Sequence, residues 1–131
     1  MTRGEVFISP DFVFSNGTSK DKFLILMNTP ADGNPFLFVL TTSQKKFRSP
    51  TLGCHSKDEY YVIEEKKHFF KLRTWVKFDS LEEMDYIKCV TWHFKGKLIK
   101  KAALNEPLII DMVNCLKQSP GITGQQISFL N

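Results

Sequence analysis

Three side chains at alternate positions, Trp75, Lys77 and Asp79, bring an aromatic ring, a cation and a carboxylate into one short segment. Residues 74–78 have the apolar and β-branched composition of a strand. Because successive side chains of a strand point to opposite faces, these three are expected on one face, as a shared site requires. On such a face the Trp75 ring could stack on a nucleobase, and Lys77 could place its positive charge beside a phosphate. The alternative is a strand-end carboxylate in an exposed pair, which contributes little to stability.

Hydroxyl and imidazole groups at further positions suit the same chemistry. Thr42 and Ser43 can donate hydrogen bonds to a phosphate, although a local turn or strand-end contact is the alternative. His55 lies in a basic stretch and has a side-chain type suited to acid or base work, whereas a merely solvated loop histidine is the alternative. His68 and His93 flank aromatic residues and are weaker candidates.

Basic residues are gathered rather than scattered. The chain has 18 Lys and Arg against 14 Asp and Glu, a formal net charge of +4 at pH 7. Merged on one face, three basic clusters would attract a polyanion such as RNA, and solvated faces are the alternative. The clusters are Lys45, Lys46 and Arg48; Lys66, Lys67, Lys71 and Arg73; and Lys95, Lys97, Lys100 and Lys101.

The cysteines predict no metal centre. Cys54, Cys89 and Cys115 are odd in number and widely spaced, which is typical of reduced thiols inside a cell. Neither Cys54 with His55 nor Cys89 with His93 has the spacing of a zinc knuckle, so we expect no metal and no other cofactor. Cys115 falls on the apolar face of an expected helix and is predicted to be a core residue.

Size and composition predict one globular domain. The 131 residues are 42% hydrophobic and 24% charged, which excludes wholesale disorder. The 12 Phe outnumber the 3 Tyr and 2 Trp, so most are expected in the core, where a ring without a polar group gains from burial. No apolar run approaches the roughly 20 residues that span a bilayer, and residues 1–6 lack the apolar stretch of a signal peptide. We therefore expect a soluble, cytoplasmic protein with no membrane partner.

The pattern along the chain predicts short strands followed by one helix. The apolar runs 23–27 and 35–40 are expected to form adjacent antiparallel strands buried on both faces. Asn105 can cap a helix that has Pro107 in its first turn and an apolar stripe as far as Leu116. The other expected elements are strands at 5–8, 12–14, 60–63 and 74–78, a glycine-containing turn at 15–19, a mobile basic loop at 41–55 and a frayed or partner-dependent tail from 122.

These elements predict a mainly β protein, folded as a small, strongly curved β-barrel with a packed C-terminal helix. The domain is expected to cover residues 1–117, and residues 118–131 are expected to be a flexible tail.

Four motifs then follow one another over residues 4–117. They are GEVF at 4–7 with FSNG at 14–17; FLIL at 23–26; LTTSQ at 40–44; and TWVKFD at 74–79 with MD at 84–85 and GKL at 96–98, before the helix. Their order and spacing resemble the PemK/MazF family of toxin endoribonucleases. That resemblance implies an SH3-like β-barrel.

The resemblance also implies a function. Members of this family cleave RNA without metal, by attack of the ribose 2′-hydroxyl on the adjacent phosphate, which requires a base, an acid and donors to the phosphoryl oxygens. The implied partners are single-stranded RNA, a cognate antitoxin protein and a second copy of the chain as a homodimer. The implied catalytic residues are Asp79 as base, Lys77 in place of an arginine, Thr42 and Ser43. His55 is a further catalytic candidate, from its side-chain type and its basic loop and not from the resemblance. The resemblance also implies Lys20, Lys22 and Gln44 as substrate-binding residues. The further substrate-binding candidates come from the residues themselves: Lys45, Lys46 and Arg48 from the first basic cluster, and Trp75 from strand alternation.

One segment departs from the family pattern. The family usually has Lys-Arg-Pro just before its second strand, and this chain has Lys20, Asp21 and Lys22 there. Either lysine would supply positive charge, but a lysine cannot make the two-pronged contact of an arginine with phosphate. A second hypothesis therefore stays open: a non-catalytic SH3-like module that binds RNA or peptide without cutting it.

Overall fold

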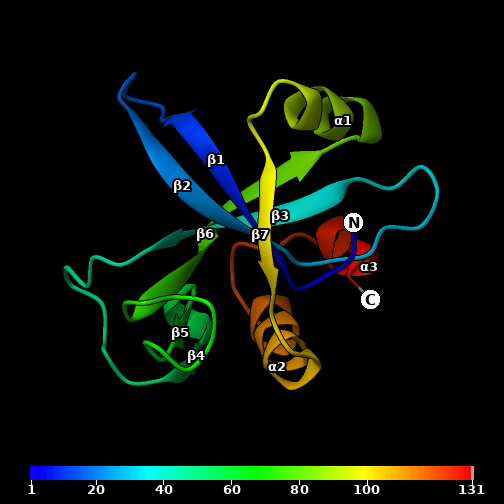
Figure 1. Ribbon diagram of the computed structural model, residues 1–131. Coiled ribbons are helices and arrows are strands. Elements are labelled where there is room, and N and C mark those ends of the chain that lie inside the picture. Colours follow the sequence, from blue (N-terminus) through cyan, green and yellow to red (C-terminus); the bar gives the residue numbers. More distant parts are fainter. Residues whose placement is uncertain (131) are drawn as a thin grey trace.

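Seven antiparallel strands form one sheet in the part of the chain that the computed structural model describes, residues 1–130 (Figure 1). The strand order is β4-β5-β6-β3-β2-β1-β7. The strands are β1 (Glu5–Val13), β2 (Ser19–Leu26), β3 (Phe36–Thr42), β4 (Gly53–His55), β5 (Tyr60–Ile63), β6 (Thr74–Met84) and β7 (Ile99–Ala103). The described residues also contain three α-helices, α1 (Tyr86–Phe94), α2 (Glu106–Lys117) and α3 (Gly124–Phe129), and a 3₁₀ turn, η1 (Ser56–Asp58).

The protein is mainly β, as predicted, but the sheet is not closed into a barrel. The edge strands β4 and β7 lie at opposite ends of the strand order and do not pair with each other. β4 has only three residues and is joined through Cys54 to Cys115 of α2, so it faces a helix instead of the other edge. β7 carries Lys100 and Lys101, and lysines on an edge strand discourage further strand pairing.

The central strands are buried on both faces, as their continuous apolar sequences predict. In β2, Ile25 belongs to a core that includes α2, whereas Leu24 and Leu26 belong to a core that includes Cys89 of α1. All four of these side chains are at most 2% exposed. In Figure 1, α1 and α2 accordingly lie on opposite sides of the sheet.

β6 is longer than predicted and irregular in its middle. The expected strand ended at residue 78, but β6 continues to Met84. In the pairing of β3 with β6, Leu40 of β3 is opposite Lys77 of β6, and the preceding residue of β3, Val39, is opposite Leu81 of β6. Residues 78–80 of β6 therefore form a bulge. A bulge re-aims side chains relative to simple alternation, which matters for Asp79.

The predicted helix is confirmed. Asn105 caps α2, and its side chain accepts a hydrogen bond of 3.1 Å from the Leu108 backbone N–H. The buried stripe includes Ile109, Met112 and Leu116. The sequence reasoning did not find α1 or β7. In the described part of the chain, no helix is long and apolar enough to cross a membrane.

Two segments expected to be loose are more ordered. The predicted loop at 41–55 is shortened at both ends, because β3 extends to Thr42 and β4 occupies 53–55. The predicted flexible tail forms α3, whose Thr123 and Gln126 make a reciprocal capping box, and Leu130 is buried in the core. Residue 131 lies outside the described residues.

The expectation of three reduced cysteines is wrong for two of them. Cys54 of β4 and Cys115 of α2 form a disulfide across a sequence separation of 61 residues. Spacing along the chain gave no sign of this pairing, because the fold alone brings β4 against α2. Cys115 is buried as predicted, and Cys89 is a buried free thiol.

Candidate functional site

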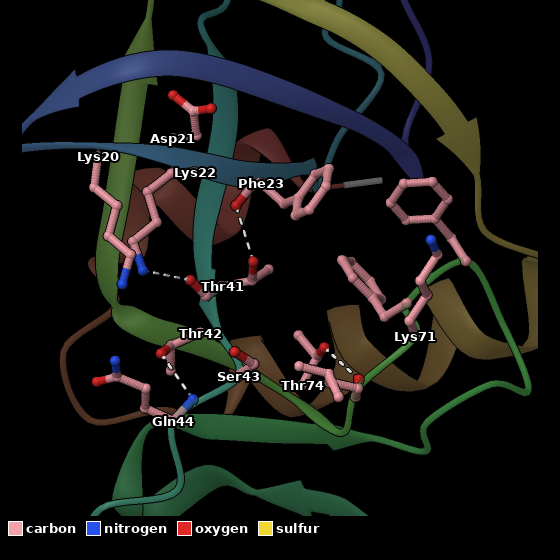
Figure 2. A pocket seen from close by; sticks show the side chains of 13 residues that line it. Lys20, Asp21, Lys22, Phe23, Thr41, Thr42, Ser43, Gln44, Lys71 and Thr74 are labelled. Carbon is pink, nitrogen blue, oxygen red and sulfur yellow. Dashed lines mark hydrogen bonds between the residues drawn. The ribbon is translucent and has the colours of Figure 1, made fainter.

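A pocket of about 420 Å³ opens where β2, β3 and the start of β6 meet (Figure 2). Residues 20–23 of β2 form one wall, and residues 41–44, at and beyond the end of β3, form the second. Residues 69–72, from the connection between β5 and β6, form the third wall, next to Thr74. The antiparallel pairing of β2 with β3 places the start of one strand beside the end of the other, which explains why segments 20 residues apart share this pocket.

Two predicted lysines reach the pocket together. Figure 2 shows the amines of Lys20 and Lys22 on the same side of β2, whereas Asp21 points to the other side, as strand alternation requires. The Lys22 Nζ donates a hydrogen bond of 3.1 Å to the Thr41 carbonyl oxygen. The Asp21 carboxylate accepts a hydrogen bond of 3.0 Å from the Asp11 backbone N–H of β1.

Positive charge is concentrated around Lys22. Burial lowers the pKa of Lys22, and the nearby cations Lys20, Lys77, Lys46 and Arg48 lower it further. Both causes disfavour the ammonium form, since burial removes hydration and like charges repel. Lys22 therefore marks a place where an anion would relieve unfavourable electrostatics.

The hydroxyl and amide groups predicted at the end of β3 line the same pocket. Thr42 Oγ1 accepts a hydrogen bond of 3.2 Å from the Gln44 backbone N–H. This is the local turn contact that was the alternative to phosphate binding for Thr42. This contact orients the hydroxyl and leaves its proton available to donate. Ser43 and Gln44 are exposed beside it. The neighbouring Thr41 hydroxyl instead donates to the Phe23 carbonyl oxygen at 3.0 Å.

The third wall of the pocket was not found from the sequence. Phe69 and Phe70 pack edge-to-face against Phe23, with ring centroids 5.3 and 5.8 Å from it. Arg73 holds this segment in place by donating to both carboxylate oxygens of Glu65, at 2.7 and 3.0 Å. The sequence feature that could have indicated this wall is the pair of adjacent phenylalanines inside a charged stretch. The pocket thus combines cations with an aromatic wall.

Asp79 lies within the bulge of β6, two residues after Lys77. Lys77 is half-buried and close enough to Lys22 to lower its pKa. Asp79 is exposed, does not line the pocket, and accepts a hydrogen bond of 3.4 Å from the Ser80 hydroxyl. Phe78, between them, is buried in the core. Val76 and Phe78 belong to one core and Trp75 to another cluster, as strand alternation predicts for residues 75–78. Neither Lys77 nor Asp79 is among the residues that line the pocket.

Trp75 and His55 lie away from the pocket. Trp75 is 4% exposed, packs with Tyr60 and Val62, and donates its indole N–H to the Ser49 carbonyl oxygen at 2.8 Å. Its expected stacking on a nucleobase is not possible in this buried position. His55 stacks on the Tyr60 ring at a centroid distance of 4.9 Å. Its Nε2 lies 2.8 Å from the Thr51 carbonyl oxygen.

The remaining predicted cations, Lys45, Lys46 and Arg48, lie in the connection from β3 to β4, directly after the pocket residue Gln44. Arg48 donates a hydrogen bond of 3.2 Å from Nη1 to the Gln44 carbonyl oxygen. The structure therefore assembles Lys20, Lys22, Thr42, Ser43 and Gln44 in one pocket and places these three cations beside it.

No protein-family model matches this chain, and no curated protein is significantly similar to it. Among the described residues, no group of three or more His, Cys, Asp and Glu side chains is placed to hold a metal ion. The pocket can bind an anion through two lysines and two hydroxyls, next to the wall formed by Phe69 and Phe70.

Proposed function

We propose that this protein is a metal-independent endoribonuclease that cleaves single-stranded RNA by attack of a ribose 2′-hydroxyl on the adjacent phosphate. The observation that carries the proposal is the convergence of Lys20, Lys22, Thr42 and Ser43 on one pocket beside an aromatic wall. Cations and hydroxyls are the groups that contact phosphate, and aromatic rings are the groups that hold unstacked bases. The proposed fold relation is to the SH3-like barrels of the PemK/MazF toxins, with the barrel opened between β4 and β7.

The reaction assigns a role to each group. The attacking 2′-hydroxyl loses its proton to a base, its oxygen bonds to phosphorus, and the 5′-oxygen leaves with a proton from an acid. The products are a 2′,3′-cyclic phosphate and a free 5′-hydroxyl. Lys20, Lys22 and the hydroxyls of Thr42 and Ser43 would stabilise charge on the phosphoryl oxygens. Asp79 is proposed as the base and Lys77 as a further cation, reached by RNA that extends from the pocket toward the β6 bulge.

A second candidate function is supported by the position of Asp79. Among the described residues that line the pocket, Asp21 has the only carboxylate, and that group accepts from the Asp11 N–H. A pocket that has cations but no carboxylate placed to act as a base suits a module that binds RNA or peptide without cutting it. The two functions share the binding surface and differ in whether a proton acceptor reaches the 2′-hydroxyl.

Incubation of the purified protein with mixed single-stranded RNA in EDTA tests the proposal. The enzyme is expected to give discrete fragments that end in cyclic phosphate, and Lys22→Met is expected to give far fewer. Intact RNA at high protein concentration, with retained binding, would favour the non-catalytic module instead.

The proposal extends to the cell. We propose a toxin that is held inactive by a cognate antitoxin and acts as a homodimer. Expression of the wild-type chain is expected to arrest growth, and the Lys22→Met variant is expected to relieve the arrest. Normal growth on expression of a folded wild-type chain would contradict the toxin role.

A further inference from the structure

Phe47 is the most exposed large hydrophobic side chain among the described residues, at 86%. It lies in the connection between β3 and β4, with Lys46 before it and Arg48 after it. The pocket residue Gln44 is three positions earlier in the chain. An aromatic ring set among cations, next to a cationic pocket, is the combination by which proteins hold single-stranded nucleic acid.

The ring is held in place from one side. The Arg48 guanidinium lies over it, with Cζ 5.0 Å from the ring centroid. Arg48 is itself fixed, because its backbone N–H donates to the Lys45 carbonyl oxygen at 2.9 Å and its Nη1 donates to the Gln44 carbonyl oxygen. Lys46 is in the left-handed region at φ 48°, a conformation that persists in a non-glycine residue when its surroundings fix it.

The connection is also anchored where it rejoins the sheet. The Ser49 backbone N–H donates to the Tyr60 hydroxyl at 2.9 Å, and the Ser49 carbonyl oxygen accepts from the Trp75 indole at 2.8 Å. Both partners are buried, at 6% and 4% exposure. Phe47 is thus presented by a short segment that is tied down on both sides, which reduces the entropy lost when it binds a ligand.

The phenylalanines of the pocket wall are placed differently. Phe69 and Phe70 pack edge-to-face against each other, with ring centroids 5.2 Å apart, and against Phe23. Phe70 is only 5% exposed. Their rings form a wall rather than a platform. Phe47 has one face toward Arg48 and most of its surface open.

The charges connect this segment to the pocket. Lys46 and Arg48 are among the cations that lower the pKa of Lys22, so they act within electrostatic range of its ammonium group. A chain of phosphates that follows these cations would run from the pocket to Phe47.

We propose that Phe47, backed by Arg48, is a stacking platform for one unpaired base of a single-stranded RNA whose adjacent phosphates lie on the cations of the pocket. This inference rests on the proposed RNA substrate and deepens it. A duplex is not a suitable ligand for the platform, because its bases are already stacked on each other. A protein partner that covers Phe47 is the competing explanation for the exposed ring.

Binding of a fluorescent single-stranded oligonucleotide with 2′-O-methyl groups tests the platform, because that oligonucleotide cannot be cleaved by 2′-hydroxyl attack. Phe47→Ala is expected to weaken its affinity about 5- to 150-fold, the range found for loss of one stacked base. Phe47→Trp is expected to retain the affinity, with a change in tryptophan fluorescence on binding. Lys45→Ala is expected to lower the slope of log affinity against log salt by about 0.7, whereas Phe47→Ala leaves the slope unchanged.

Phe94→Ala is the matched control, since Phe94 is 82% exposed but lies at the end of α1, outside the pocket. Its affinity for the oligonucleotide is expected to equal that of the wild type, and both alanine variants are expected to unfold at the wild-type temperature. Unchanged affinity in Phe47→Ala, an equal loss in Phe94→Ala, or an equal loss with double-stranded RNA would overturn the platform.

The experiment separates this inference from the proposed function. Specific binding through Phe47 without cleavage of unmodified RNA would contradict the endoribonuclease and leave the platform standing. Cleavage with no effect of Phe47→Ala on binding would leave the endoribonuclease standing and overturn the platform. A wild-type protein that fails to bind the oligonucleotide overturns the platform directly.

Discussion

The Nζ of Lys22 in β2 lies 3.1 Å from the carbonyl oxygen of Thr41 in β3, to which it donates a hydrogen bond. This contact fixes a half-buried ammonium group at the pocket, although Lys20, Lys77, Lys46 and Arg48 all repel it. A charge that is held against repulsion is typical of a functional site, where stability is sacrificed for binding. Lys22 is therefore the first residue to test.

Lys22→Met is expected to lose activity and gain stability. Loss of a positioned cation is expected to slow RNA cleavage about 10²- to 10³-fold. Because the pKa of Lys22 is lowered in the folded state, its charge opposes folding below that pKa, and this penalty disappears as the pH rises toward the unfolded value of 10.5. The variant is thus expected to melt above the wild type at pH 7, with a smaller difference at alkaline pH. Thermal unfolding at several pH values measures this.

Lys20→Met is the matched control for Lys22, because Lys20 lines the same pocket but is exposed. It is expected to weaken RNA binding without a gain in melting temperature. A gain of equal size in both variants would mean that overall charge, and not the position of Lys22, sets the stability.

Lys77 and Asp79 are expected to act on one transition state. Asp79→Ala is expected to slow cleavage about 10²- to 10⁴-fold, as removal of a proton acceptor does. The double alanine variant is expected to be barely slower than the worse single variant. Binding separates the two roles: Lys77→Ala weakens RNA affinity, whereas Asp79→Ala leaves it equal or tighter because a like charge is removed. Single-turnover rates and equilibrium binding measure both.

Full activity in Asp79→Ala would contradict its role as base. That result fits the exposed position of Asp79 outside the pocket and would move the search to Thr42, Ser43 and His55. Strictly multiplicative losses in the double variant would show that Lys77 and Asp79 act independently.

The disulfide between Cys54 and Cys115 is expected to stabilise the fold. It closes a loop of 61 residues and ties the edge strand β4 to α2. Reduction is expected to lower the free energy of unfolding by about 2–4 kcal/mol, chiefly because the unfolded chain regains freedom. Guanidinium unfolding with and without reductant measures the loss, and Cys54→Ser is expected to make the protein insensitive to reductant. Equal stability in both conditions would contradict the contribution of the disulfide.

Glu5 is expected to make a pH-dependent contribution to the free energy of unfolding. Burial alone would raise its pKa, but Lys100, at 2.7 Å, and the Thr2 backbone N–H, at 2.8 Å, outweigh burial and lower the pKa. Stability from a lowered carboxyl pKa is fully present above the unfolded value of 4.5 and is lost as the pH falls through the folded value. Glu5→Gln is expected to destabilise the protein by about 1 kcal/mol at pH 7, because the Lys100 side chain is 56% exposed.

The difference between Glu5→Gln and the wild type is expected to shrink as the pH falls below 4.5 and to vanish below the folded pKa, measured by urea unfolding at a series of pH values. Glu106→Gln is the control, because Glu106 also pairs with a cation, Arg3, but its side chain is 62% exposed. Its effect is expected to be smaller at pH 7. A loss in Glu5→Gln that does not change with pH would attribute the effect to packing.

Local rules in the sequence determined several elements of this protein. The apolar run at 23–27, which includes the last four residues of β2, packs on both faces because every position in the run is hydrophobic. Asn105, whose side chain accepts a first-turn hydrogen bond, and Pro107 fixed the start of α2. Lys20, Lys22, Thr42 and Ser43 could each be named as candidates from short motifs, whereas their meeting in one pocket follows from the pairing of β2 with β3. In each of these predictions the information lies within a few residues or in an ordered motif.

Tertiary structure alone decided the rest. The Cys54–Cys115 pairing depends on α2 packing against β4, which spacing along the chain does not encode. The bulge at residues 78–80, where Asp79 lies, comes from a register shift against β3 that the sequence of β6 alone does not reveal. Trp75 is buried because β5 supplies Tyr60 and Val62 beside it, and the open sheet results from two edges that never meet. Each of these outcomes is set by contacts between segments far apart in the sequence, whose energies appear only once the chain has folded.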